Sequence, residues 1–143
     1  MQSTATAVWT GGLKDGKGLL GAGTGSFTGL PYDFGKRFEG ANTPGTTPEE
    51  LIAAAHSGCF AMALSGGLGA AGFTAEKISV KSVVTLDRVD GKATVTKSAL
   101  TVAAKVPGID AAKFAQIAEE TKLGCPISRL LKAEITLDAT LVA

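Results

Sequence analysis

The strongest hydrophobic pattern in the chain is the segment TPEELIAAAHSGCFAMALSGGLGAAG, residues 47–72. Leu51, Ala55 and Cys59 recur at helical spacing, and nearly every residue around them is small or apolar. Thr47 can cap a helix here, because a proline suited to the first helical position and two carboxylates follow it. The segment predicts a long central helix that is buried almost all round.

The second half of the chain alternates in the manner of strands. Residues 77–89 and 92–106 are rich in Val, Thr, Ile and Ala, and Asp90-Gly91 between them is a strong two-residue turn signal. These segments predict an antiparallel hairpin. Residues 134–142 alternate apolar and polar positions, which predicts a further, half-solvated antiparallel strand.

Helix signals lie between the hairpin and the last strand. Asp110 can cap a helix that runs to about Leu123, and Cys125-Pro126 resembles the cap and first position of a short helix. The glycine-rich residues 11–29 predict short strands joined by turns. Together these elements indicate the α+β class.

Length and composition narrow the possible functions. A chain of 143 residues fits one domain, placed here at residues 1–143, that buries roughly two thirds of its unfolded surface. The formal charge of +1 and the 45% hydrophobic content argue against disorder and against nucleic acid as a partner. The first residues lack a basic segment before an apolar run, and no stretch is expected to reach the ~20 apolar residues of a membrane span. We therefore expect a cytoplasmic protein with no membrane partner.

Two glycine patterns and the set of possible metal ligands give little support for a bound nucleotide or a metal ion. GKGLLG at 16–21 has the spacing of a dinucleotide fingerprint, and GGLKDGKG at 11–18 resembles a phosphate-binding loop. Both motifs require a helix directly afterwards, whereas more glycines follow here. Two cysteines and His56 leave a four-ligand zinc site incomplete. We expect turns, no bound cofactor and no metal.

The two cysteines sit in different surroundings. Cys59 lies in the middle of the apolar helix, where a free cysteine often serves simply as a small hydrophobe. Cys125 lies between Gly124 and Pro126 at a helix start, where unpaired amides favour a thiolate. The pattern favours reactivity at Cys125, whereas for Cys59 taken alone it favours inert packing over reactivity.

Three charged or titratable residues could act with these thiols. Arg37, flanked by Phe34 and Phe38, is suited to stabilise an anion in an apolar pocket, although an ordinary solvated loop arginine fits as well. Glu49 could hold that guanidinium by a two-pronged hydrogen bond, although its place in a first helical turn needs no such role. His56 could pair with a cysteine one turn later, but a core-lining histidine is the favoured interpretation.

Several motifs together resemble the osmotically inducible OsmC family. They are PEELIAAAHSGCFAMAL at 48–64 and GCPISRLLKAEITLDA at 124–139, with KRFEG at 36–40, AGFT at 71–74 and VPGIDA at 106–111. The similarity spans nearly the whole chain, so chance agreement over one motif does not explain it. The organic hydroperoxide resistance branch shares the two cysteines, but the segment after the second one is closer to OsmC proper.

The resemblance implies a fold and a set of roles. The fold is an intertwined homodimer in which antiparallel sheets wrap around two long central helices, with active sites at the subunit interface. Cys59 would be the peroxidatic residue and Cys125 the resolving one. Arg37 would stabilise the thiolate and the leaving oxygen, and Glu49 would hold Arg37.

The implied activity is a thiol peroxidase that reduces organic hydroperoxides and hydrogen peroxide and defends against oxidative or osmotic stress. It would proceed through a Cys59 sulfenic acid and a Cys59–Cys125 disulfide, reduced by an external thiol such as dihydrolipoamide. The alternatives are a redox sensor or a small-molecule-binding protein on the same fold. A peroxidatic Cys59 requires a thiol pKa well below ~8.5, whereas a packing cysteine would titrate near or above it.

Overall fold

The computed structural model describes residues 1–143 and contains two compact units, residues 1–51 and 52–143. Their boundary falls inside the long helix α2 (Pro48–Ala70). Each unit holds one three-stranded sheet, and helices accompany both, as expected for the α+β class. The assignment of residues 1–143 to a single domain stays a prediction.

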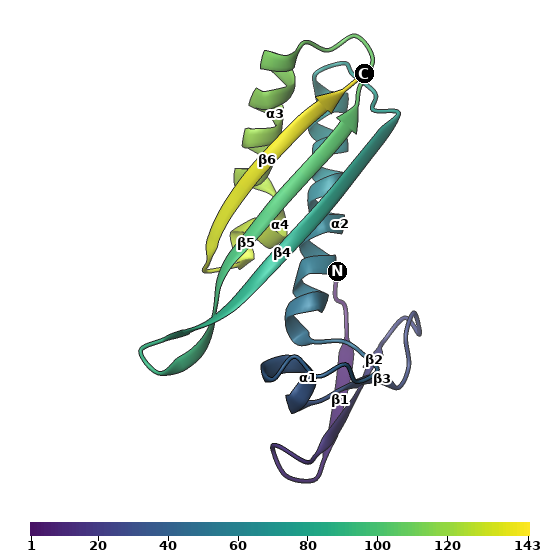
Figure 1. Ribbon diagram of the computed structural model, residues 1–143. Helices are drawn as coiled ribbons and strands as arrows, with labels where there is room; N and C mark the ends of the chain where they lie inside the picture. The colour runs from purple at the N-terminus through teal and green to yellow at the C-terminus, as the bar shows by residue number, and fades with distance from the viewer. The chain divides into compact units, whose positions relative to one another are not determined.

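The first unit is a small antiparallel sheet followed by a short helix (Figure 1). Its strands are β1 (Ala5–Thr10), β2 (Lys17–Ala22) and β3 (Leu30–Tyr32), and its helix is α1 (Phe34–Phe38). The glycine-rich segment therefore forms strands and turns, as predicted, and neither glycine motif opens a helix.

Apolar side chains of the first unit remain open to solvent. Every residue of β1 is exposed, and Val8, Leu13 and Leu19 are 62%, 69% and 51% exposed. The buried hydrophobic core of the molecule consists only of residues beyond position 59. The small sheet thus has no hydrophobic core of its own within a single chain.

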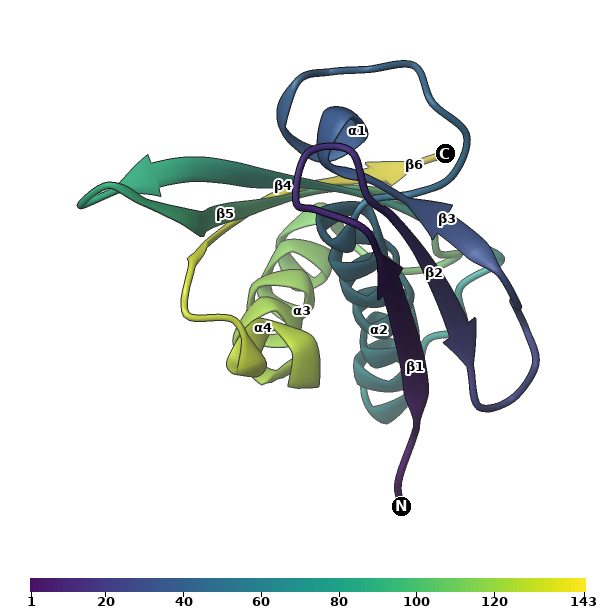
Figure 2. The same ribbon diagram turned by 90° about the horizontal axis from the view of Figure 1, so that it is seen from below.

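The second unit packs helices against one face of a longer sheet. The sheet contains β4 (Lys77–Val89), β5 (Lys92–Lys105) and β6 (Glu134–Val142) in that order. Figure 2 shows the helices α2, α3 (Ala111–Gly124) and α4 (Pro126–Leu130) on the same face. The core between these layers is built from large apolar side chains of the sheet and the helices, including Phe60, Leu64, Leu68, Leu100, Val102, Phe114 and Ile117.

The hairpin prediction is confirmed, but the predicted direction of the last strand is wrong. Asp90 and Gly91 both have positive φ, 51° and 77°, which suits a tight hairpin turn between β4 and β5. In contrast, β6 pairs with β5 in parallel. The α3–α4 connection returns the chain to the end of the sheet where β5 begins, so β6 must run in the same direction.

The helix α2 is buried on one face only, which corrects the prediction of burial all round. His56, Phe60, Leu64 and Leu68 follow one another every four residues and are 0% exposed, whereas Met62 is 79% exposed. The exposed side of α2 carries mainly small residues, among them Ala54, Ala55, Gly58 and Gly66. Because α2 is apolar nearly throughout, its sequence does not distinguish the covered face from the open one.

The helix α2 also corrects the expectation that no segment approaches a membrane span. It has 23 residues and is long and apolar enough to cross a bilayer by length and composition alone. A core helix can satisfy the same criterion, and Phe60, Leu64 and Leu68 do pack into the core of the second unit. Length and composition are therefore weak evidence for a membrane role.

Candidate active site

The two cysteines of the second unit lie side by side. Cys59 comes from the middle of α2, and Cys125 ends α3 and begins α4. Their Sγ atoms are 3.3 Å apart and both are free thiols. Cys125 is fully buried, whereas Cys59 is partly exposed. The pair can therefore form a disulfide after a small movement, and Cys59 is the member that solvent reaches.

The surroundings of the two thiols move their pKa values in opposite directions. Burial is the main cause that raises the pKa of Cys59, and the neighbouring Cys125 adds to it. Burial acts in the same sense on Cys125, but the polar groups of the helix start at Ser128 and Ile127, together with the neighbouring Cys59, lower its pKa overall. The helix start predicted this effect at Cys125. Within one chain, Cys125 is thus the thiol that ionises more readily.

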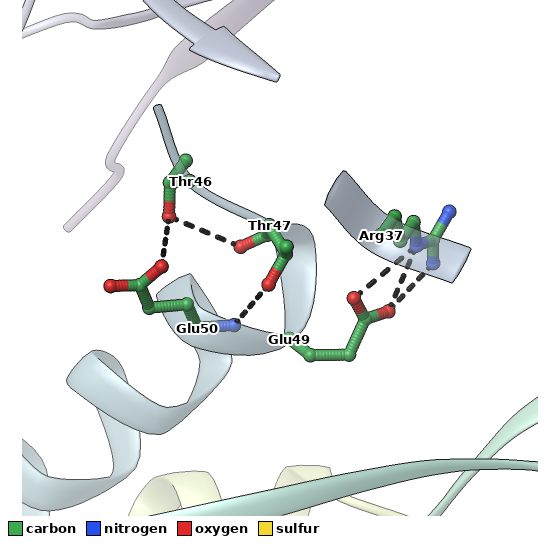
Figure 3. A network of polar contacts seen from close by, with 5 residues as sticks. All are labelled: Arg37, Thr46, Thr47, Glu49 and Glu50. Carbon is green, nitrogen blue, oxygen red and sulfur yellow. Dashed lines mark hydrogen bonds and ion pairs between the residues drawn. The ribbon is translucent and has the colours of Figure 1, made fainter. Parts of the chain in front are cut away.

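The predicted partners Arg37 and Glu49 contact each other in the first unit. Arg37, on α1, donates from Nη2 to Oε1 of Glu49 at 2.7 Å and from Nε to the same oxygen at 3.1 Å (Figure 3). Glu49, in the first turn of α2, is 9% exposed. A two-pronged contact fixes the plane of a guanidinium, so Glu49 orients the cation that Arg37 presents.

The first turn of α2 is itself fixed by threonines, which holds Glu49 in place. Thr47 Oγ1 accepts from the backbone N–H of Glu50 at 3.1 Å, which confirms the predicted cap. Thr46 Oγ1 donates to Oε2 of Glu50 at 3.1 Å (Figure 3). The two neighbouring glutamate side chains therefore bind different partners, since Glu50 accepts from Thr46 and Glu49 binds Arg37.

Asp33 anchors the helix that carries Arg37. Its Oδ1 accepts from the backbone N–H of Lys36 at 2.8 Å, and its Oδ2 pairs with Nζ of Lys17 at 2.8 Å. The Lys17 hydrogen bond is the main cause that lowers the pKa of Asp33 to about 2, and the Lys36 amide adds to it. Sequence reasoning missed Asp33, although an aspartate before FGKRF is an ordinary N-cap signal.

We expect acid to release this anchor. The pKa of Asp33 is lower in the folded chain than its ordinary value of 3.8. Its charge therefore stabilises the first unit fully at pH values above 3.8, and this contribution is lost as the pH falls through about 2. The Lys36 amide resonance should therefore titrate with a midpoint near that lower value. A midpoint close to 3.8, measured by NMR, would contradict the cap geometry, and in Asp33→Asn the titration should disappear.

A cavity of about 260 Å³ lies beside Arg37 within the first unit. Aromatic rings form much of its lining, from Trp9, Tyr32, Phe34 and Phe38. The Arg37 guanidinium carbon lies 5.0 Å from the centroid of the Phe38 ring. The predicted arrangement of a permanent cation among aromatic rings is thus present, with Trp9 and Tyr32 added by the pairing of β1, β2 and β3.

His56 is a buried core histidine, as favoured from the sequence. Its Nδ1 lies 2.7 Å from Ser98 Oγ and its Nε2 lies 2.8 Å from Ser128 Oγ. Both ring nitrogens are thereby occupied by serines and neither binds Cys59, so the alternative Cys59–His56 pair is wrong. Burial lowers the pKa of His56, which favours the neutral ring. No three potential metal-ligating side chains are grouped together anywhere in the chain.

Comparison with known proteins places this chain in a family. The family described as OsmC-like protein matches residues 40–140. Peroxiredoxin OsmC of Escherichia coli (strain K12) is 52% identical over 132 residues, which cover 92% of this chain and 91% of that protein, and the Shigella flexneri protein of the same name gives the same values.

Solved structures share the fold at lower identity. An OsmC-like protein from Mycoplasma pneumoniae has a TM-score of 0.76 at 16% identity and covers 100% of this chain and 99% of its own. An organic hydroperoxide resistance protein from Elizabethkingia anophelis has a TM-score of 0.72 at 24% identity and covers 99% and 96%. The family match and the 52% identity show that this chain belongs to the OsmC family of peroxiredoxin-type enzymes.

Proposed function

We propose that the chain reduces hydroperoxides through a sulfenic acid on Cys59 and a disulfide between Cys59 and Cys125. The observation that carries this proposal is the 3.3 Å separation of the two sulfurs, one partly exposed and the other fully buried. A peroxide can reach the partly exposed Cys59 from solvent, whereas Cys125 is buried and is not accessible to the oxidant. This asymmetry fits an attacking thiol and a resolving thiol.

The chemistry balances without a bound cofactor. The Cys59 thiolate attacks one peroxide oxygen, the O–O bond breaks, and the other oxygen leaves as an alkoxide that takes up a proton. Cys125 then attacks the Cys59 sulfenic acid, which forms the S–S bond and releases water. An external dithiol or thiol, such as dihydrolipoamide, returns the disulfide to two thiols. Rapid resolution protects Cys59 from irreversible oxidation.

Burial raises the pKa of Cys59 within one chain, so a fixed cation beside it would favour its thiolate. Burial disfavours its thiolate within one chain, and a fixed guanidinium would offset that effect and meet the leaving oxygen as well. The Arg37–Glu49 pair supplies such a cation. Along the unbroken helix α2, however, Glu49 and Cys59 are separated by ten residues, or about 15 Å. We therefore infer that the pair serves Cys59 of a partner chain.

Two exposed surfaces support a homodimer with shared sites. The open face of α2 carries small residues such as Ala55 and Gly58, which permit close approach of a second helix. The first unit leaves Val8, Leu13 and Leu19 exposed and has no buried apolar core of its own. A second copy that covers both surfaces would bury them and bring one chain's Arg37 to the other chain's Cys59.

Organic hydroperoxides are the substrates that we favour, with hydrogen peroxide as a smaller alternative. The cavity beside Arg37 is lined mainly by aromatic rings, which suits an apolar substituent on the peroxide. Several structural relatives are described as organic hydroperoxide resistance proteins. The expected role is defence against oxidative or osmotic stress in the cytoplasm.

Turnover separates this enzyme from a redox sensor on the same fold. With a recycling dithiol in excess, the chain should consume many equivalents of an organic hydroperoxide per Cys59. A sensor would stop after one oxidation per thiol pair. Consumption that stops at one equivalent, while the disulfide is shown to be reduced by the dithiol, would contradict the proposed function.

Subunit mixing tests the shared site. A Cys59→Ser chain still offers Arg37 and Glu49, and a Glu49→Ala chain still offers both cysteines. Mixing the two under conditions that exchange subunits should restore one competent site per mixed dimer, or about a quarter of wild-type activity at random exchange of equal amounts. Each variant alone should stay impaired.

The matched control replaces Glu50, whose side chain accepts from Thr46 and does not bind Arg37. A Glu50→Gln chain should be active as a homodimer, without mixing with another variant. No recovery in confirmed mixed dimers, or full activity in a demonstrably monomeric form, would overturn the shared site and leave the cysteine chemistry standing.

A further inference from the structure

Two aromatic rings of the small sheet meet above a glycine. Trp9 on β1 pairs with Gly18 on β2, and Gly18 pairs with Tyr32 on β3. Directly paired residues share a face of a sheet, and strands on either side of a common neighbour lie about 9.5 Å apart. The ring centroids of Trp9 and Tyr32 are nevertheless only 5.5 Å apart. The two rings therefore lean towards each other over the position that has no side chain.

Gly18 is required for this arrangement of the rings. A Cβ atom at position 18 would overlap the Tyr32 ring, since its three nearest heavy atoms all belong to that ring and the farthest of them is only 2.7 Å away. The φ angle of Gly18 is not positive, so its backbone conformation does not demand glycine. Glycine inside a strand often marks a place where another group approaches closely. Here that group is the Tyr32 ring.

The loop between β1 and β2 holds Trp9 in place. The Nε1 of Trp9 donates to the Gly12 carbonyl at 3.3 Å. A Cβ atom at position 16 would lie 2.7 Å from the same Nε1, so Gly16 also leaves room for the indole. The Trp9 side chain is still 37% exposed. It is thus a fixed ring that a small molecule can reach.

Both rings line the cavity that also contains Arg37. This cavity of about 260 Å³ is smaller than the roughly 300–1,000 Å³ of pockets that bury drug-sized ligands. Its remaining apolar lining comes from Leu13, Phe34 and Phe38. A cavity of this size suits a substituent with one ring better than a long acyl chain.

Arg37 keeps one nitrogen available for a ligand in the cavity. Its Nε and Nη2 bind Glu49, whereas Nη1 points away from Glu49 and makes no hydrogen bond within the chain (Figure 3). The carboxylate of Asp33, the other charged group of the lining, is already bound by Lys17 and by the Lys36 amide. The cavity therefore offers a donor for a peroxide oxygen together with an aromatic surface for the substituent.

We propose that Gly18 is a specificity-determining residue, which lets Trp9 and Tyr32 form a binding surface for hydroperoxides that carry one aromatic ring. This inference rests on the proposed function and names the substrate class of the same site. Aromatic rings prefer offset or edge-to-face contacts. The planes of Trp9 and Tyr32 are 52° apart, so the ring of a ligand meets one of them by its face and the other nearer its edge.

A purely structural role for the glycine makes a different prediction. If Tyr32 only covered a weak point of β2, a change at Gly18 would affect all peroxides alike. Specificity instead requires that a peroxide with a ring and a peroxide without one respond differently.

Gly18→Ala places a methyl group against Tyr32 and should displace its ring. The KM for cumene hydroperoxide, which carries one aromatic ring, should rise by about tenfold, whereas turnover of hydrogen peroxide should not change. Gly21→Ala is the matched control in the same strand, because a Cβ atom there would meet only Thr6 Oγ1, at 3.1 Å. It should keep the wild-type KM for both peroxides. In a Tyr32→Leu background, Gly18→Ala should have no further effect on either KM.

A binding measurement does not depend on turnover. Trp9 is the only tryptophan of the chain, so its fluorescence reports on this cavity directly. The alcohol 2-phenyl-2-propanol, which is the reduced form of cumene hydroperoxide, should change the emission saturably and bind Gly18→Ala about tenfold more weakly. At the same concentrations tert-butanol, which has no ring, should give no saturable change.

The possible outcomes separate this inference from the proposed function. Binding of 2-phenyl-2-propanol by folded Gly18→Ala protein as tightly as by wild type, or an equal loss of activity with both peroxides, would overturn the specificity role of Gly18. Absence of turnover with every peroxide in wild type would instead refute the proposed function, and the fluorescence titration would still decide whether Gly18 shapes a site for an aromatic ring.

Discussion

Cys59→Ser should lower peroxide turnover by at least about a thousandfold, because the attacking sulfur is lost and no other exposed thiol is present. Cys125→Ser should behave differently. Cys59 can still be oxidised once, but the sulfenic acid persists and proceeds to irreversible acids when peroxide is in excess. Stopped-flow peroxide consumption and mass spectrometry of trapped sulfenic acid distinguish the two variants.

The lower pKa of Cys125 in a single chain makes this comparison decisive. If acidity alone chose the attacking thiol, the sulfenic acid would form on Cys125. We expect access to decide instead, because Cys125 is fully buried and Cys59 is not. Preferential sulfenic acid on Cys125 in the wild-type protein would reverse the two roles.

Arg37→Ala should lower the rate of the first oxidation by about a hundredfold or more, since a fixed donor to a developing anion is lost. It should also raise the pKa of Cys59 further, so that part of the lost rate returns as the pH is increased. Cys59 lies beyond the first turn of α2, and the helix dipole has little effect at that distance from the helix start. Arg37 is therefore expected to supply most of the field that favours the Cys59 thiolate. The pH dependence of Cys59 alkylation measures the shift.

Two other arginines provide the controls. Arg88 donates to the Gly91 carbonyl in the exposed hairpin turn, so Arg88→Ala should leave both the alkylation profile and the turnover unchanged. Arg129 lies one turn after Cys125 and is the competing cation. An unaltered Cys59 titration in Arg37→Ala together with a large shift in Arg129→Ala would contradict the assignment.

The sequence predicts the elements better than their faces and directions. The hairpin at Asp90-Gly91 and the cap at Thr47 depend on residues close in sequence, and both are confirmed. The direction of β6 depends on how α3 and α4 return the chain, which the alternation within residues 134–142 does not contain. In the same way, α2 is too uniformly apolar to show which face is covered.

The same difference between local and long-range contacts applies to the candidate site. Arg37 and Glu49 are twelve residues apart, and their pairing could be expected from residue type and position. The serines that bind His56 are 42 and 72 residues away from it, and neither belongs to a recognisable local motif. Such contacts follow from the packing of α2, β5 and α4, so a lone histidine in an apolar helix gives no indication of its partners.

The parallel pairing of β5 with β6 has a consequence for how the chain folds. The β4–β5 hairpin joins neighbours in sequence and can form early, but β6 can add to β5 only after the α3–α4 crossover is in place. That crossover also carries Cys125, which is 66 residues from Cys59. We therefore expect a partly folded chain that lacks the α3–α4 crossover to present Cys59 without its partner thiol, so that the disulfide can close only after this long-range contact forms.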